Sequence, residues 1–177
     1  MPDPESLPLP DAVQRVVGVL QSRQHPHRPV MLDAAARTAQ QAADALGVAL
    51  GQIAKSIIFR RMPDDVAILV VTSGDRRVHE GRVAELVCGE GSKLGRADAE
   101  FVKSRTGFSI GGVAPLAHVG RCVTLLDREL FRFDEIWAAA GHPHAVFRLT
   151  PQQLLQLTGA PVADVVEPVP APAAPCT

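Results

Sequence analysis

The sequence predicts an α+β fold: a mixed, mostly antiparallel, barrel-like β-sheet core flanked by short helices. Segments with helical periodicity and short apolar segments of strand length are intermixed, without the strict alternation of parallel α/β folds. The chain has 177 residues, 46% hydrophobic and 21% charged, which suits one globular core. We therefore expect a single domain over residues 1–167 and a flexible, proline- and alanine-rich tail over residues 168–177.

The first half of the chain predicts two helices followed by a β-hairpin. Apolar residues at helical spacing favour an amphipathic helix over residues 11–21. A capping-box pattern at Thr38 begins a second, short helix, which Gly47 ends. Residues 53–61 and 66–72 are rich in β-branched and apolar side chains, and a Pro-Asp turn separates them. We expect a hairpin whose second strand is buried on both faces.

The second half predicts four further helices and three further strands. The predicted helices span residues 80–88, 97–104, 133–140 and 150–158. The predicted strands span residues 121–126, 145–149 and 162–166. Thr150 repeats the capping-box pattern, with proline at the first helical position, and Gly159 ends that helix. The helix over 133–140 would carry Trp137, and the glycine-rich segments 89–95 and 106–115 are predicted loops.

The composition argues against several classes of protein. No apolar run approaches the roughly 20 residues that span a membrane, and the N-terminus lacks a signal-peptide pattern, so we expect a cytoplasmic protein. The three cysteines form no C-x-x-C pair, so neither a disulfide framework nor a metal site is expected. We expect the cysteines to be reduced thiols with a structural role. A net charge of −1 and only three lysines argue against general DNA or RNA binding, so any RNA contact should be local.

Two segments could carry chemistry. Lys55 stands at the head of an apolar strand, where burying an unpaired ammonium is costly, so it faces either solvent or a polar cleft. In the segment 109–115, Gly111 and Gly112 let the backbone approach a ligand, and Pro115 stiffens the exit. Amides presented in this way can hold a carbonyl oxygen or an oxyanion. The structural alternatives are a lysine that reaches solvent and a tight turn.

Four motifs follow one another along the chain. They are T-A-x-x-A-A-x-x-L-G over residues 38–47, I-A-K-S over 53–56, an apolar strand over 66–71, and G-G-V-x-P over 111–115. In this order they resemble the YbaK/prolyl-tRNA synthetase-associated (INS-like) trans-editing domain family, over about residues 30–167. The resemblance implies a free-standing aminoacyl-tRNA deacylase without metal or organic cofactor. Its partner would be the acceptor end of mischarged tRNA, and an aminoacyl-tRNA synthetase is a further candidate.

The resemblance also implies roles for individual residues. The lysine that matches Lys55 positions the terminal adenosine, and the loop that matches Gly111–Pro115 binds the aminoacyl carbonyl region. The ribose hydroxyl of the substrate helps the attacking water. In this sequence the amides of Gly112 and Val113 would face the carbonyl, and small apolar walls would select by size. The expected site is Lys55 as catalytic residue and, as substrate-binding residues, Gly111, Gly112, Val113, Ala114, Pro115, His118 and His144.

Other titratable groups allow alternatives. His118 and His144 could shape the pocket or act as a base, or could stabilise loops; His142, His25 and His27 are expected to be structural. The serines show no Ser-His-Asp pattern, the 89–95 loop lacks P-loop order, and Asp127 is expected to cap a turn. The alternative function is a non-catalytic module that binds an aminoacyl group, a nucleotide or a nucleic acid. A structural partner of a synthetase is a third possibility.

Overall fold

The computed structural model describes residues 8–169 and contains eight strands and five α-helices. The strands are β1 (Val30–Met31), β2 (Ile53–Met62), β3 (Val66–Ser73), β4 (Lys93–Arg96), β5 (Cys122–Asp127), β6 (Ile136–His142), β7 (Ala145–Leu149) and β8 (Val162–Ala163). The helices are α1 (Asp11–Ser22), α2 (Ala39–Leu46), α3 (Glu80–Val87), α4 (Ala99–Thr106) and α5 (Pro151–Thr158). Two short 3₁₀ turns are η2 (Leu50–Gln52) and η3 (Arg128–Arg132).

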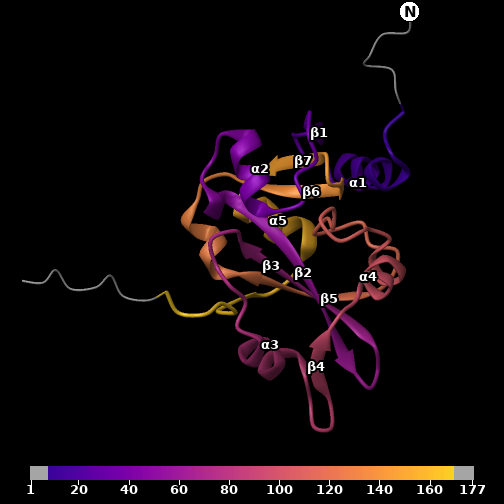
Figure 1. Ribbon diagram of the computed structural model, residues 1–177, viewed down its shortest axis with the longest axis vertical. Coiled ribbons are helices and arrows are strands. Elements are labelled where there is room, and N and C mark those ends of the chain that lie inside the picture. The colour runs from indigo at the N-terminus through magenta and orange to yellow at the C-terminus, as the bar shows by residue number, and fades with distance from the viewer. Residues whose placement is uncertain (1–7, 170–177) are drawn as a thin grey trace, which may run out of the picture.

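The strands form one mixed sheet (Figure 1). Their order is β1-β7-β6-β2-β3-β5-β8, and β4 pairs with β2 outside this path. The pairs β1–β7, β2–β3, β2–β4 and β6–β7 are antiparallel. The pairs β2–β6, β3–β5 and β5–β8 are parallel. This arrangement confirms the predicted α+β class with a mixed sheet.

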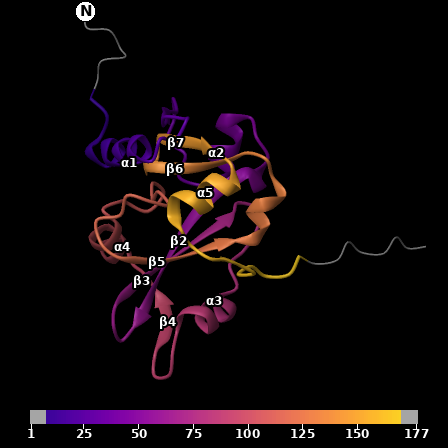
Figure 2. The ribbon, with the colours of Figure 1, turned by 180° about the vertical axis from the view of Figure 1, so that it is seen from behind.

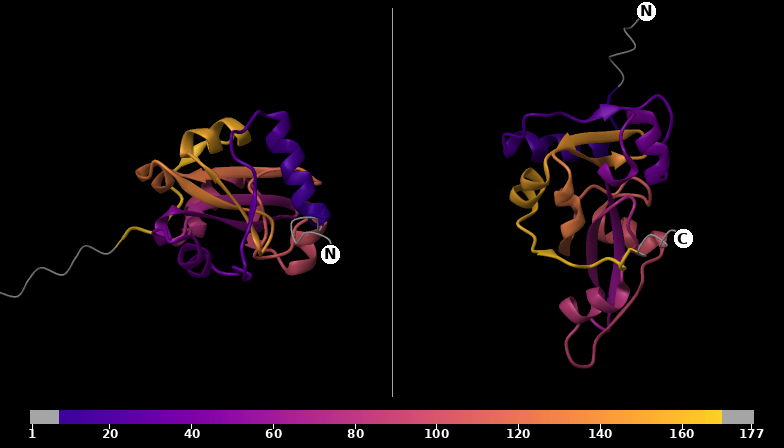
Figure 3. Two further views of the ribbon diagram at one scale, coloured as in Figure 1. Left: turned by 90° about the horizontal axis from the view of Figure 1, so that it is seen from above. Right: turned by 90° about the vertical axis from the view of Figure 1, so that its left-hand side faces the viewer.

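Helices cover both faces of the sheet. Seen from above, α1 and α5 lie on one side of the strands and α2 on the other, and from behind α5 lies in front of them (Figures 2 and 3). The largest core cluster joins α1 and α5 to the sheet through Val13, Val16, Leu69, Phe147 and Leu154, all fully buried. The far end of the β2–β3 hairpin extends away from this core together with β4 and α3 (Figure 1).

The predicted starts and ends of helices are confirmed at α2 and α5. The Thr38 hydroxyl accepts a hydrogen bond from the Gln41 amide at 3.2 Å, and Gly47 ends α2 with a φ of +66°. The Thr150 hydroxyl likewise accepts from the amide at the third position of α5. The hairpin is confirmed as well: β2 and β3 pair from Ala54 to Arg61 on β2, and nearly all of β3 is buried.

The helix predicted over residues 133–140 is wrong. The structure has the strand β6 there, because alternate residues Ile136, Ala138 and Ala140 are buried in the core, as a strand between two neighbours requires. Pairing with β7 on one edge and β2 on the other outweighs the helix propensity of the alanines. Trp137 therefore lies on a strand.

Smaller differences concern short edge elements. β1 was not predicted, and β4 occupies part of the expected 89–95 loop because it pairs with the last four residues of β2. The last strand is shorter than predicted: only Val162–Ala163 pair with β5, while Val166 forms an isolated bridge with Val78. Most of the predicted tail, residues 170–177, lies outside the described residues. No helix within residues 8–169 has the length and apolarity needed to cross a membrane.

Candidate functional site

A pocket opens where one edge of β2 has no neighbouring strand. On this edge β2 pairs with β6 only at Ile53 and Ala54, and with β4 only from Phe59 onward. The cavity beside the intervening residues 55–58 has a volume of about 220 Å³. It is closed by the start of α2, by β6 and β7, and by the loop at residues 110–113. Backbone groups on an unpaired strand edge can form hydrogen bonds with a ligand.

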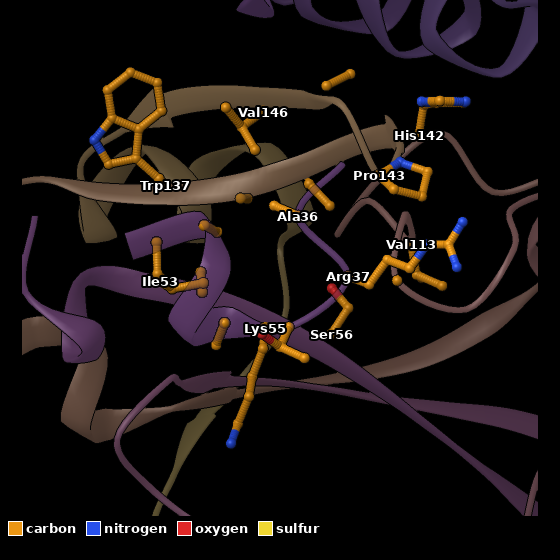
Figure 4. Close-up of a pocket in the computed structure, with 18 of the residues that line it drawn as sticks. Ala36, Arg37, Ile53, Lys55, Ser56, Val113, Trp137, His142, Pro143 and Val146 are labelled. Carbon is orange, nitrogen blue, oxygen red and sulfur yellow. The ribbon is translucent and has the colours of Figure 1, made fainter. Parts of the chain in front are cut away.

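The walls of the pocket are small and apolar (Figure 4). They are formed by Ala36, Ala39, Ala42, Ala54, Ala138, Ala139 and Ala145, with Ile53, Ile57, Ile110, Val113, Val146 and Trp137. Two polar atoms in these walls, Ser56 Oγ and Trp137 Nε1, are buried and have no hydrogen-bond partner among the described residues. A bound molecule would therefore meet a mainly apolar surface.

Lys55 lines the pocket with its side chain, which extends away from Val113 and His142 (Figure 4). Its Nζ donates a hydrogen bond to the carbonyl oxygen of Arg76 at 2.7 Å. Burial lowers the pKa of Lys55 below its ordinary value, an effect that the nearby carboxylates of Asp75 and Asp127 partly oppose. An ammonium carries three donors, so further hydrogen bonds to a ligand are possible.

Four charged side chains form a network around the turn whose Arg76 carbonyl accepts the hydrogen bond from Lys55. Arg76 pairs with Asp75 at 3.2 Å and with Glu129 at 3.3 Å. Arg132 pairs with the same two carboxylates, at 2.8 and 2.9 Å. The network fixes the segment after β3 and thereby the carbonyl to which Lys55 donates.

Asp127 supports this end of the pocket from inside the core. Its fully buried carboxylate accepts hydrogen bonds from the Thr72 hydroxyl at 2.9 Å and from the Ser73 amide at 3.0 Å. It also accepts from the Glu129 amide at 2.9 Å and so caps η3, which confirms the predicted capping role. Because Thr72 is the β3 partner of Lys55 in the sheet, Asp127 fixes the strand beside the lysine.

The glycine loop closes the other end of the pocket. Gly111, with a φ of +92°, and Val113 line the cavity. Gly112 lies behind them: a Cβ at this position would be 2.9 Å from the Cα of His142, so only glycine fits without movement of the backbone. The loop therefore approaches the β6–β7 turn more closely than any side chain would allow.

The amides of the glycine loop differ in their hydrogen bonds. The Gly112 amide donates to the Ser109 carbonyl at 2.9 Å, so it is not free to hold an oxyanion, in contrast to the expectation from the sequence. The amides of Gly111 and Val113 have no acceptor among residues 8–169. Ala114 and Pro115 are buried and do not line the cavity.

The two predicted histidines support the pocket from outside it. His118 Nε2 donates to the carbonyl of Ala114 at 2.8 Å, and burial lowers the pKa of His118 although this hydrogen bond opposes the shift. His144 Nδ1 donates to the carbonyl of Leu32 at 2.9 Å. Neither residue lines the cavity. His118 therefore braces the loop, and His144 braces the segment that precedes α2.

His142 and Arg37 line the pocket and were not predicted as site residues. His142 Nδ1 accepts a hydrogen bond from the His144 amide at 3.1 Å, which leaves Nε2 as the donor of the neutral ring. His142 follows a glycine at the end of a strand, a position that could have suggested a site residue. The incorrect prediction of a helix over 133–140 prevented this interpretation. Arg37 could have been suspected because it directly precedes a helix N-cap.

Three further observations concern metals and thiols. Within residues 8–169, no group of three or more His, Cys, Asp or Glu side chains could hold a metal ion. Cys88 and Cys122 are free thiols, and Cys176 lies outside the described part of the chain. Burial raises the pKa of the Cys122 thiol to about 11.

Comparison with known families decides which family this fold and pocket represent. Residues 33–157 match the family model of the aminoacyl-tRNA editing domain. The chain belongs to the aminoacyl-tRNA editing domain family. Every residue that lines the pocket lies within the matched range. The resemblance expected from the four motifs is thereby confirmed.

Individual relatives agree with this assignment. The chain is 34% identical to the uncharacterized protein YwhH of Bacillus subtilis (strain 168) over 121 residues, 68% of this chain and 74% of YwhH. It is 28% identical over 94 residues to a proline–tRNA ligase of Thermoanaerobacter sp. (strain X514), which is 53% of this chain but only 16% of the ligase. The similarity to the ligase therefore concerns a small part of that enzyme.

Solved structures share the complete fold. A candidate trans-editing enzyme for prolyl tRNA synthetase is 42% identical, with a TM-score of 0.82 over 91% of this chain and 100% of that chain. The crystal structure of a hypothetical protein is 31% identical, with a TM-score of 0.79 over 86% of this chain and 99% of that one. The editing-domain fold of this protein is established by these similarities.

Proposed function

We propose that this editing domain is an aminoacyl-tRNA deacylase that acts in trans on tRNA bearing a small noncognate amino acid. The observation that carries the proposal is that Lys55, Gly111 and Val113 line one apolar pocket. A lysine on β2 and two loop residues whose amides have no acceptor within residues 8–169 therefore belong to one site. The acceptor end of mischarged tRNA is the proposed substrate, and a synthetase is a candidate partner.

The proposed mechanism needs positioning and carbonyl polarisation. Lys55 would hold the terminal adenosine at one end of the pocket, using donors that the Arg76 carbonyl leaves free. The amides of Gly111 and Val113 would stabilise the negative charge that develops on the ester carbonyl oxygen. The attacking water would be assisted by the ribose hydroxyl next to the ester. An aminoacyl ester is already activated, so these contributions suit its hydrolysis.

The alanine-rich walls support a small amino acid as the substrate. Alanine side chains at several wall positions leave room for a short aliphatic or hydroxylated side chain in a cavity of about 220 Å³. Apolar pockets discriminate poorly between molecules that differ by one methylene, so we expect several related amino acids to be accepted. Alanine, serine and threonine esters are the first to test.

The decisive experiment measures deacylation of a panel of tRNAs mischarged with alanine, serine and threonine. We expect hydrolysis of at least one, and a loss of about 100-fold or more in rate for Lys55→Ala. Lys93→Ala, which removes an exposed lysine on β4, is the matched control and should retain wild-type rates. Thermal unfolding of each variant checks that the fold is retained.

Two results would contradict the proposal. Tight binding of these tRNAs without ester cleavage across the panel would favour the alternative, a non-catalytic binding module. Wild-type rates in a folded Lys55→Ala protein would remove the lysine from the mechanism and leave the loop as the only active element.

A further inference from the structure

The structure places an unpaired cation at the mouth of the pocket. Arg37 lines the cavity, and its side chain is exposed. None of the ion pairs formed within residues 8–169 includes it. Some arginines of the fold pair with carboxylates, namely Arg60, Arg61, Arg76, Arg77, Arg82, Arg132 and Arg148. Others, such as Arg23 and Arg128, form no ion pair within residues 8–169 but do not line the cavity. Within the described residues, Arg37 is thus the arginine that combines a guanidinium without an ion pair with a place in the lining of the pocket.

The backbone that carries Arg37 is fixed although its side chain is free. The Arg37 amide donates to Gln41 Oε1 at 2.9 Å, as part of the hydrogen bonds that cap α2. The glycine loop packs directly against it: a Cβ on Gly111 would lie 3.7 Å from the Cα of Arg37. In Figure 4, Arg37 lies on the same side of the pocket as Val113 and His142. The guanidinium thus starts from a defined point beside the loop.

The charge around the pocket favours an anion at this point. No aspartate or glutamate lines the cavity, and the charged or titratable side chains that do are Arg37, Lys55 and His142. The ammonium group of an esterified amino acid would be repelled by a guanidinium. A guanidinium binds phosphates and carboxylates through paired hydrogen bonds, and phosphates are the anions that tRNA carries.

We infer that Arg37 binds a backbone phosphate of the single-stranded 3′ end of the tRNA where that strand enters the pocket. This inference rests on the proposed deacylase function and assigns a second cationic contact to the same substrate. Lys55 would act within the pocket and Arg37 at its mouth, so the RNA strand would pass over the start of α2. One local contact of this kind also fits a chain with a net charge of −1.

The test compares Arg37→Ala, Arg37→Lys and the control Arg23→Ala on mischarged tRNA at several salt concentrations. Arg23 is an exposed arginine that does not line the pocket. We expect Arg37→Ala to raise KM about 10-fold with little change in kcat, and to reduce the slope of log(kcat/KM) against log salt by about one. Arg37→Lys should restore part of the loss, and Arg23→Ala should behave as wild type.

A second substrate separates the phosphate contact from a structural effect. An aminoacyl ester of adenosine without any phosphate should be hydrolysed equally by wild type and Arg37→Ala. An unchanged salt slope on tRNA, or an equal loss on both substrates, would overturn the assignment of Arg37 while the deacylase function stands. Failure of the wild-type protein to hydrolyse any mischarged tRNA would overturn both.

Discussion

The two ends of the pocket are built in different ways. At the Lys55 end, Asp75, Arg76, Glu129 and Arg132 form a closed set of ion pairs that fixes the turn receiving the ammonium. At the loop end, position is set by close backbone contact, because Gly112 packs against the backbone of His142. No side chain of the loop segment 109–115 is charged.

Under the proposed function, this difference corresponds to a division of tasks. A charged network that fixes the acceptor of the Lys55 hydrogen bond holds the ammonium in place, which suits a contact with the terminal adenosine. Packed glycines hold amides without any titratable group, which suits a carbonyl oxygen that becomes negative only during the reaction. Substitutions at the two ends should therefore lower activity for different reasons. At the loop they should displace backbone amides, and at the lysine they should change the local charge and the stability of the fold.

Among the substitutions that test this comparison by disturbing the supports of the pocket, the largest effect is expected at the loop. Gly112→Ala places a methyl group 2.9 Å from the His142 Cα, so the loop must move and carry the free amides of Gly111 and Val113 with it. We expect deacylation to fall by about 100-fold, as for the loss of an oxyanion donor. We also expect overpacking to lower the free energy of unfolding by about 1–3 kcal/mol.

Gly89→Ala is the matched control for this loop variant. A Cβ on Gly89 meets no atom within 4 Å, and that residue lies in an exposed loop. Deacylation rates and urea unfolding of both variants check the prediction. If Gly112→Ala keeps full activity, tight loop packing is not what positions the amides.

The next effect is expected beneath the lysine. Asp127→Asn replaces a carboxylate that accepts three hydrogen bonds by an amide with one oxygen, so at least one buried donor loses its acceptor. We expect a loss of about 1–3 kcal/mol in unfolding free energy. We also expect activity to fall by about 10-fold, because a positioning residue acts on the reaction only through the group that it holds.

Asp134→Asn serves as the control, since Asp134 is exposed and forms no ion pair or side-chain hydrogen bond with the described residues. Urea unfolding and kcat/KM are the measurements. A variant as stable and active as wild type would show that the buried carboxylate does not support this end of the pocket.

Much of this arrangement follows from local sequence rules. The capping boxes at Thr38 and Thr150 and the hairpin at residues 53–72 depend on residues close together in the chain, and all three were predicted. The ordered motifs were enough for the family, and they pointed to Lys55 and the glycine loop. Both segments line the pocket, in agreement with that hypothesis.

What could not be predicted depends on contacts between distant segments. The alanines of the β6 segment favour a helix in the sequence, and pairing with β2 and β7 is what makes this segment a strand. His142 and Arg37 meet the loop from opposite halves of the sequence, so no local pattern marks them. The Gly112 amide was assigned to the substrate, whereas the turn itself uses it for the Ser109 carbonyl.

The smallest expected effect is a pH dependence at the lysine end. Because burial lowers the pKa of Lys55, its ammonium loses its proton at a lower pH than that of an unfolded lysine. Between the two pKa values the unfolded chain binds more protons, so the contribution of Lys55 to stability rises with pH there. The activity contribution has the opposite sign, since it requires the charged form, and should be lost over the same interval.

The variant Lys55→Arg tests both pH dependences, that of stability and that of activity, because a guanidinium stays charged throughout the interval. Relative to this variant, wild type should gain stability and lose a few-fold in kcat/KM as pH rises through the lowered pKa of Lys55, after correction for spontaneous ester hydrolysis. Parallel profiles of wild type and Lys55→Arg would mean that the titration of Lys55 does not control the reaction. The lysine would then act through its shape and hydrogen bonds, and the contrast between the two ends would be one of packing alone.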